Sequence, residues 1–164
     1  MTNDLTDLRA LIEFASERIE MIFRKSGVIH SMYHAIAADG KHELISPASD
    51  DKDIAVALMR AAFELRGIDR YVFCDEAWII DTSKSGRTIT EAEWAKIRRE
   101  GLRNHPDRRE IVMFSAENRR GEQLLASRYI LRPEHGKATL MPLAFQEIFD
   151  KSEGRMVGLL KKER

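Results

Sequence analysis

The chain has 164 residues, of which 43% are hydrophobic and 33% are charged, and these proportions suit one domain with its own core and a charged surface. Its 27 basic and 27 acidic residues balance, which removes any global electrostatic case for binding nucleic acid or a membrane surface. The single cysteine, Cys74, excludes an intrachain disulfide, and no apolar run approaches the ~18 residues of a membrane span. Because the first residues are polar and acidic, unlike a signal peptide, we expect a cytoplasmic protein.

Apolar periodicity predicts a first helix and a hairpin after it. Apolar residues recur at steps of three and four over 4–26, which predicts an N-terminal helix that either packs on a sheet or pairs with a second copy of the chain. Residues 28–38 alternate as a strand, and 41–46 form the return strand. The Asp39-Gly40 pair between them is typical of a two-residue hairpin turn.

A second helix is predicted over 49–66, with Ser49 as its cap and Gly67 just after its end. Its apolar residues recur with helical spacing, which predicts one buried stripe. The stripe consists of Ile54, Ala57, Leu58, Ala61, Ala62 and Leu65.

The most informative stretch is 70–81, which follows at once and predicts a central strand. It is rich in aromatic and β-branched residues on both faces, as a strand covered on both sides requires. It also contains two adjacent acids, Asp75 and Glu76, and buried carboxylates are uncommon unless they are paired. Alternation with period two sends the two acids to opposite faces, so this strand alone does not form a paired-carboxylate site.

The second half of the chain predicts one more helix and a meander. A capping box at Thr90 and Glu93 opens a helix over 91–100. Three strands follow, at 110–117, 122–132 and about 137–146.

Together these elements predict an α+β fold. It has a single, mostly antiparallel sheet of about six strands, with an N-terminal helix and two crossover helices packed against it. Residues 1–146 form a single domain, and 147–164 form a C-terminal tail that is either loose or a short docking helix.

Glu76 is the first candidate site residue. In an apolar strand beside Trp78, its carboxyl would have a raised pKa that suits a general acid or base. The alternative is a structural acid in a buried salt bridge, with Arg128 or Arg132 from the meander as its partner.

The turn before the meander supplies further candidate catalytic residues, which are His105, Asp107 and Arg108. A histidine titrates near neutral pH, and an arginine can bind an anion. With Glu76 they would form an acid–base pocket roofed by Trp78. The alternative is an ordinary connection from helix to strand, in which Asp107 caps the turn.

Two motifs stand out in combination. Asp75-Glu76-Ala77-Trp78 is followed, after a charged stretch, by His105-Pro106-Asp107-Arg108-Arg109-Glu110-Ile111-Val112 and an arginine-rich meander. With these motifs the chain resembles, over residues 30–145, a group of small uncharacterised bacterial proteins with no established activity. The resemblance implies a bacterial, cytosolic, single-domain protein and adds no chemistry.

No cofactor and no metal site are expected. The chain contains no nucleophile elbow, Walker loop or dinucleotide-binding glycine pattern. His30 and His34 share a strand face, but a two-residue turn would put His42 on the other face, which disfavours a three-histidine site. Cys74 has no second cysteine with which to hold a structural zinc.

The favoured hypothesis is a non-enzymatic binding or protein-interaction module that forms a homodimer and meets an unknown protein partner. A sheet face or the N-terminal helix would be the contact surface. One alternative is a small enzyme with a Glu76/His105 acid–base pocket. The other is a nucleic-acid binder that uses the basic segment 96–109, although a solvated helix face with internal salt bridges explains this segment better. No membrane partner is expected.

Overall fold

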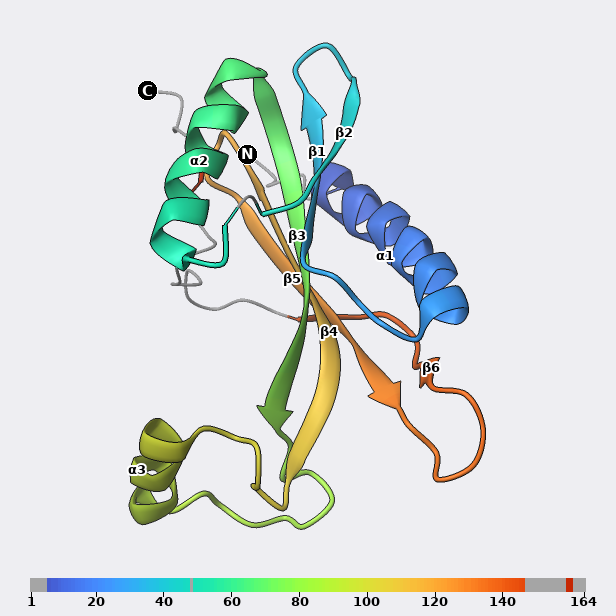
Figure 1. Ribbon diagram of the computed structural model, residues 1–164, viewed down its shortest axis with the longest axis vertical. Helices are drawn as coiled ribbons and strands as arrows, with labels where there is room; N and C mark the ends of the chain where they lie inside the picture. The colour runs from blue at the N-terminus through green and yellow to red at the C-terminus, as the bar shows by residue number, and fades with distance from the viewer. Residues whose placement is uncertain (1–5, 48, 147–158, 161–164) are drawn as a thin grey trace.

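The computed structural model describes residues 6–47, 49–146 and 159–160 of the chain. These residues form an α+β fold, as predicted, with three helices and a curled antiparallel sheet of seven strands (Figure 1). The strand order is β2-β1-β3-β4-β5-β6, and β7 pairs with another part of β5. The elements are α1 (Thr6–Ser26), β1 (Met32–Ala37), β2 (His42–Ile45), α2 (Lys52–Leu65), β3 (Ile68–Ile80), α3 (Glu91–Glu100), β4 (Arg108–Asn118), β5 (Gln123–Leu131), β6 (Thr139–Leu140) and β7 (Ala144–Gln146).

The two faces of the sheet carry separate cores. Helix α1 lies on one face, where Leu8 and Ile12 are fully buried in a cluster with Val72 of β3. Helix α2 covers the other face with Met59 and Phe63, which pack among aromatic residues of β1 and β3. Residues 159–160 are buried in this second core, whereas the rest of the predicted tail lies outside the described residues.

Strand β3 is the centre of the sheet. It pairs with β1 up to Cys74 and with β4 as far as Ile80. Cys74 belongs to the core under α1 and Phe73 to the core under α2. The alternation that sends Asp75 and Glu76 to opposite faces is thereby confirmed.

Helix α3 departs from the predicted position. Strands β3 and β4 are antiparallel neighbours that extend beyond the rest of the sheet as a two-stranded arm, and α3 lies at the tip of this arm (Figure 1). None of its residues is buried. It therefore belongs to the connection of a long hairpin, whereas α2 is a true crossover helix between β2 and β3. None of the helices in the described ranges has the length and apolar content needed to cross a bilayer.

The turn between β1 and β2 is one residue longer than predicted. The amide of Ala37 donates to the carbonyl of Lys41 at 2.9 Å, so the loop has three residues and ends on Gly40 with φ at 84°. Ile36 then faces His42 across the strands. His42 consequently shares a face with His34, and the prediction that it points the other way is wrong.

Helix α2 buries a different stripe from the one predicted. Its buried residues are Ala55, Met59 and Phe63, whereas Ile54, Leu58 and Leu65 are 53%, 47% and 89% exposed. The helix is apolar around most of its circumference, so periodicity alone does not choose between two stripes. The larger side chains of Met59 and Phe63 fill the space over Tyr33 and Tyr71, and this packing sets the rotation of the helix.

Candidate functional site

Glu76 lies on the face of the sheet that carries α1. It is opposite Val112, and Trp78 is opposite Glu110, so Glu76 and Glu110 are diagonal neighbours on one face. Arg132, just after β5, joins both acids. Its Nη2 lies 3.4 Å from Glu76 Oε1 and 2.8 Å from Glu110 Oε1, and its Nε donates to Glu110 Oε2 at 2.7 Å. The structure thus supplies the Arg132 partner of the salt-bridge interpretation and adds a second carboxylate.

The two carboxyl groups titrate differently. A hydrogen bond to Glu110, assisted by burial and by repulsion from that second carboxylate, raises the pKa of Glu76 to about 7, although Arg132 opposes the shift. The forked bond from Arg132 holds the pKa of Glu110 below its usual value. Of the two carboxyl groups, Glu76 is therefore the one that exchanges a proton near neutral pH.

An open groove of about 460 Å³ borders this carboxylate pair. Trp78 is 41% exposed in it, and the Arg108 guanidinium lies 4.6 Å from the centroid of its ring. Glu110 and Arg132 also line the groove. The groove thus presents an exposed indole, the guanidinium groups of three arginines and the Glu110 carboxylate, and Arg132 links it to Glu76. Such a surface can hold a polar ligand.

Arg128, the other predicted partner of Glu76, is engaged elsewhere. Its Nε donates to the carbonyl of Met141 at 2.6 Å, and its Nη1 donates to Ser16 Oγ at 3.2 Å and to Glu20 Oε2 at 2.7 Å. These bonds tie α1 to β5 and to the chain after β6.

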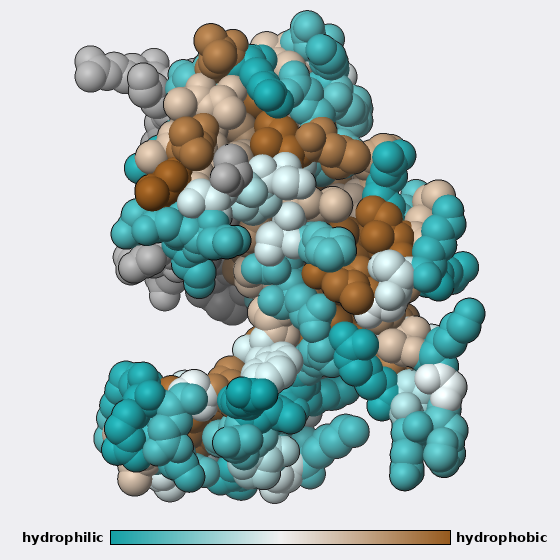
Figure 2. Space-filling model, viewed as in Figure 1, coloured by the Kyte–Doolittle hydropathy of each residue, from teal (hydrophilic) through white to brown (hydrophobic). Residues whose placement is uncertain are grey.

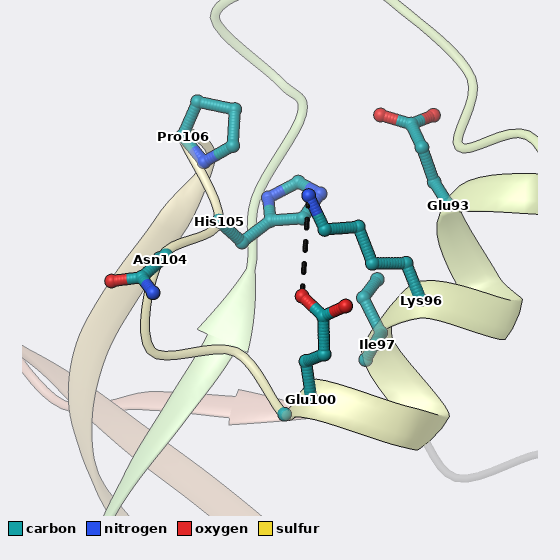
Figure 3. Close-up of a pocket in the computed structure, with 8 residues that line it drawn as sticks. Glu93, Lys96, Ile97, Glu100, Asn104, His105 and Pro106 are labelled. Atoms are coloured by element: carbon teal, nitrogen blue, oxygen red, sulfur yellow. Dashed lines mark ion pairs between the residues drawn. The ribbon is translucent and has the colours of Figure 1, made fainter.

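His105 lies at the tip of the arm, in a small cavity of about 140 Å³ between α3 and the turn before β4 (Figure 3). Its Nδ1 accepts a bond from the amide of Asp107 at 3.1 Å. Its Nε2 is shielded from solvent and has no hydrogen-bond partner among the described residues. Lys96 and Glu100 of α3, which are 4.0 Å apart, line the same cavity.

Asp107 has a structural role in the turn. Its carboxylate accepts a bond from Arg87 Nε at 2.7 Å, and Arg87 Nη1 also donates to Glu93 of the α3 capping box at 2.6 Å. This arrangement matches the interpretation of 104–107 as an ordinary connection from helix to strand.

The structure does not bring Glu76 and His105 together. Four strand positions, or about 13 Å, separate Glu76 from Ile80 at the end of β3, and Ile80 is opposite Arg108. His105 lies beyond that end and faces α3, whereas Glu76 is bound by Arg132 on the face of the sheet that carries α1. Of the four predicted residues, Glu76 and Arg108 share one surface, and His105 and Asp107 share another.

His34 and His42 form a pair that was not predicted, because the predicted turn placed them on opposite faces of the hairpin. His34 Nε2 and His42 Nδ1 are 2.9 Å apart, and the ring of Phe14 packs edge-on against His34. Burial, with smaller effects of the charges of His42 and Arg18, lowers the pKa of His34 to about 4. Among the described residues no group of three His, Cys, Asp or Glu side chains lies close enough to hold a metal ion.

The outer face of α2 is the other conspicuous surface. Ile54, Leu58, Ala61 and Leu65 lie along it, and all four are exposed. Figure 2 shows hydrophobic side chains on the surface over this helix, at the upper left of the view. We call these four residues the α2 seam.

Comparisons of the chain with known protein families, with curated proteins and with solved structures find no match.

Proposed function

We propose that the protein is an interaction module that self-associates, and that two copies pair through their α2 seams. The single observation that supports this proposal most strongly is the exposure of the seam, in which Leu65 is 89% and Ile54 53% exposed. Soluble monomers rarely expose contiguous apolar surface of this kind.

The spacing of the seam suits a helix–helix contact. Its members follow one another at steps of four, three and four residues, which is the heptad spacing of a coiled-coil face. From Ile54 to Leu65 the seam spans about 16 Å of helix. A second copy of the same helix offers a surface of matching length and chemistry.

Charge favours an antiparallel pair. The start of α2 carries Asp51 and Asp53 beside Lys52, whereas its last turn carries no basic residue and Glu64 there is followed by Arg66. A symmetric antiparallel pair that is centred on the seam keeps the two acidic starts apart. A parallel pair would place like charges together.

Helix α1 is a weaker candidate for the contact surface than its sequence suggested. Leu8 and Ile12 are fully buried against the sheet of their own chain, so the apolar stripe of α1 belongs to the core. Replacing them with Asp would unfold the protein and would report nothing about assembly.

Sedimentation velocity over a range of concentrations tests the proposal. We expect a monomer–dimer equilibrium for the wild type and a monomer with an unchanged circular dichroism spectrum for Leu58→Lys. Met21→Lys is the matched control, because Met21 is 60% exposed on α1 and lies outside the seam. A wild type that stays monomeric at 100 μM, or a Leu58→Lys variant that still dimerises, would refute the proposal.

Cysteine crosslinking tests the orientation. In the antiparallel pair Leu58 of one copy faces Ala61 of the other, so chains with Leu58→Cys and chains with Ala61→Cys should crosslink when they are mixed and oxidised. Cys74 is buried and does not interfere. Crosslinks between two Leu58→Cys chains that form faster than the mixed crosslink would contradict the antiparallel arrangement.

A second candidate function is acid–base chemistry at Glu76 and Glu110, without His105. The raised pKa of Glu76, to about 7, beside the Trp78 groove supports it. Carboxyl ¹³C NMR should show one group that titrates near pH 7 in the wild type and is lost in Glu76→Gln. Titration of every glutamate below pH 5.5 would remove this candidate.

The nucleic-acid alternative receives less support. In the basic segment 96–109, Arg98 pairs with Glu91 at 2.7 Å, Arg99 with Glu100 at 2.9 Å and Arg109 with Asp81 at 3.0 Å. Internal pairing of these three arginines reduces the positive charge that the segment offers to phosphates, so we expect only weak retention on a polyanion resin at low salt.

A further inference from the structure

The largest of the described cavities lies under the start of α2, with a volume of about 710 Å³. It opens where β1 leaves the sheet. The last pair between β1 and β3 joins Met32 and Cys74, and at the next position the contact passes to side chains. There Ser31 Oγ donates to Asp75 Oδ1 at 2.7 Å. Asp75, on the face opposite Glu76, thus has a defined position in the wall of this cavity.

The carboxylate of Asp75 is held by one oxygen and leaves the other available. Oδ1 accepts both the Ser31 hydroxyl and the amide of Glu76, the latter at 2.9 Å. In the described ranges no hydrogen bond to Oδ2 is found. This second oxygen is open to a further hydrogen bond, and a cationic donor forms the strongest bond to a carboxylate.

The rest of the cavity combines an apolar wall with an excess of negative charge. Phe73 and Ala55, which are 4% and 3% exposed, supply apolar wall from the sheet and from α2. The charged residues that line the cavity are Asp50 and Asp75 against Lys52, and His30 and serine hydroxyls lie beside them. The volume lies within the range of small-molecule sites.

We infer that this cavity is a binding site for a small organic cation, namely a primary alkylamine in its charged form. The ammonium group would donate to Asp75 and to the hydroxyls near it, and the alkyl chain would lie against Phe73 and Ala55. A metal ion fits poorly, because no group of three ligating side chains is assembled in the described part of the chain. An anion would face two carboxylates. The inference does not depend on dimerisation through the α2 seam.

Amide NMR titrations with n-pentylamine, n-pentanol and pentanoate at one pH and ionic strength test the inference. The three probes share an alkyl chain and differ in the charge of the head group. We expect pentylamine to shift the amides of Ser31, Ala55 and Asp75, with a dissociation constant on the order of 1 mM. Pentanol should bind at least tenfold more weakly, and pentanoate should cause no saturable shift at these amides.

Three variants locate the interaction. Asp75→Asn keeps the shape of the side chain and an acceptor for Ser31, and it should weaken pentylamine binding at least tenfold. Lys52→Met removes a like charge from the cavity and should tighten binding severalfold. Asp53→Asn, in the same turn of α2 but outside the cavity, should leave the affinity within twofold.

Any of three results would overturn the inference. These are equal binding of pentanol and pentylamine, saturable binding of pentanoate at the same amides, and affinities that stay unchanged in both Asp75→Asn and Lys52→Met.

Discussion

Removal of the Arg128 side chain should lower the stability of the protein, because this side chain is buried and donates hydrogen bonds to two other segments. It donates to the Met141 carbonyl at 2.6 Å, to Ser16 at 3.2 Å and to Glu20 at 2.7 Å. Arg128→Met keeps most of the side-chain stem and removes all three bonds. The bonds to Met141 and Ser16 contribute about 1 kcal/mol each. The bond to Glu20, which is 29% exposed, contributes about 1 kcal/mol after screening by solvent.

The free energy of unfolding of Arg128→Met should therefore fall by about 2–3 kcal/mol, which lowers the Tm by about 5–10 °C. Urea denaturation followed by circular dichroism measures it. A double-mutant cycle with Glu20→Gln should give a coupling energy of about 1 kcal/mol. The control cycle pairs Arg128→Met with Glu76→Gln and should give a coupling near zero, because Glu76 is bound by Arg132. Stronger coupling of Arg128 to Glu76 than to Glu20 would refute the assignment of partners.

Three further predictions concern stability. The folded-state pKa of Glu76, about 7, lies above the unfolded value of 4.5, so the stability that its protonated form contributes is complete below pH 4.5 and is lost as the pH rises through 7. In urea titrations the free energy of unfolding of Glu76→Gln should therefore rise relative to that of the wild type by roughly 1–2 kcal/mol from pH 5 to pH 8. Parallel pH profiles of the two proteins would contradict this. The folded-state pKa of His34, about 4, lies below the unfolded value of 6.5, so the free energy of unfolding should fall by roughly 1–2 kcal/mol as the pH drops from 7 to 5. Thermal scans of His34→Leu should lack this loss of stability at low pH, and a pH dependence identical to that of the wild type would count against it. Leu8→Ala should lower the free energy of unfolding by about 3 kcal/mol, because Leu8 is fully buried. Leu65→Ala, measured at a concentration that keeps the protein monomeric, should change it by less than about 0.5 kcal/mol. Equal losses in the two variants would mean that the α2 seam is part of the monomer core.

Local chemistry was sufficient to predict several parts of the fold. The alternation of 70–81 placed Asp75 and Glu76 on opposite faces because the side-chain period of a strand leaves no choice. The capping box at Thr90 and Glu93 is present as predicted, because all of its bonds lie within four residues.

The failures occurred where the outcome depends on distant residues or on one turn. A hairpin loop of three residues, where two were predicted, moved His42 to the face of His34, since one extra residue changes the register. The choice between two apolar stripes of α2 was made by the aromatic residues beneath it, which the periodicity of the helix does not contain. Glu110 could not be assigned to Glu76 from the sequence, because their proximity requires the pairing of β3 with β4 across the α3 connection.

Native mass spectrometry of the wild type and of Leu58→Lys, at one concentration and without added ligand, tests self-association through the α2 seam most directly. The subunit mass is 18.9 kDa. Pairing through the seam predicts a wild-type species of twice that mass and a Leu58→Lys species at the subunit mass. A wild type found at the subunit mass alone, or a dimer that persists in Leu58→Lys, would contradict pairing through the seam.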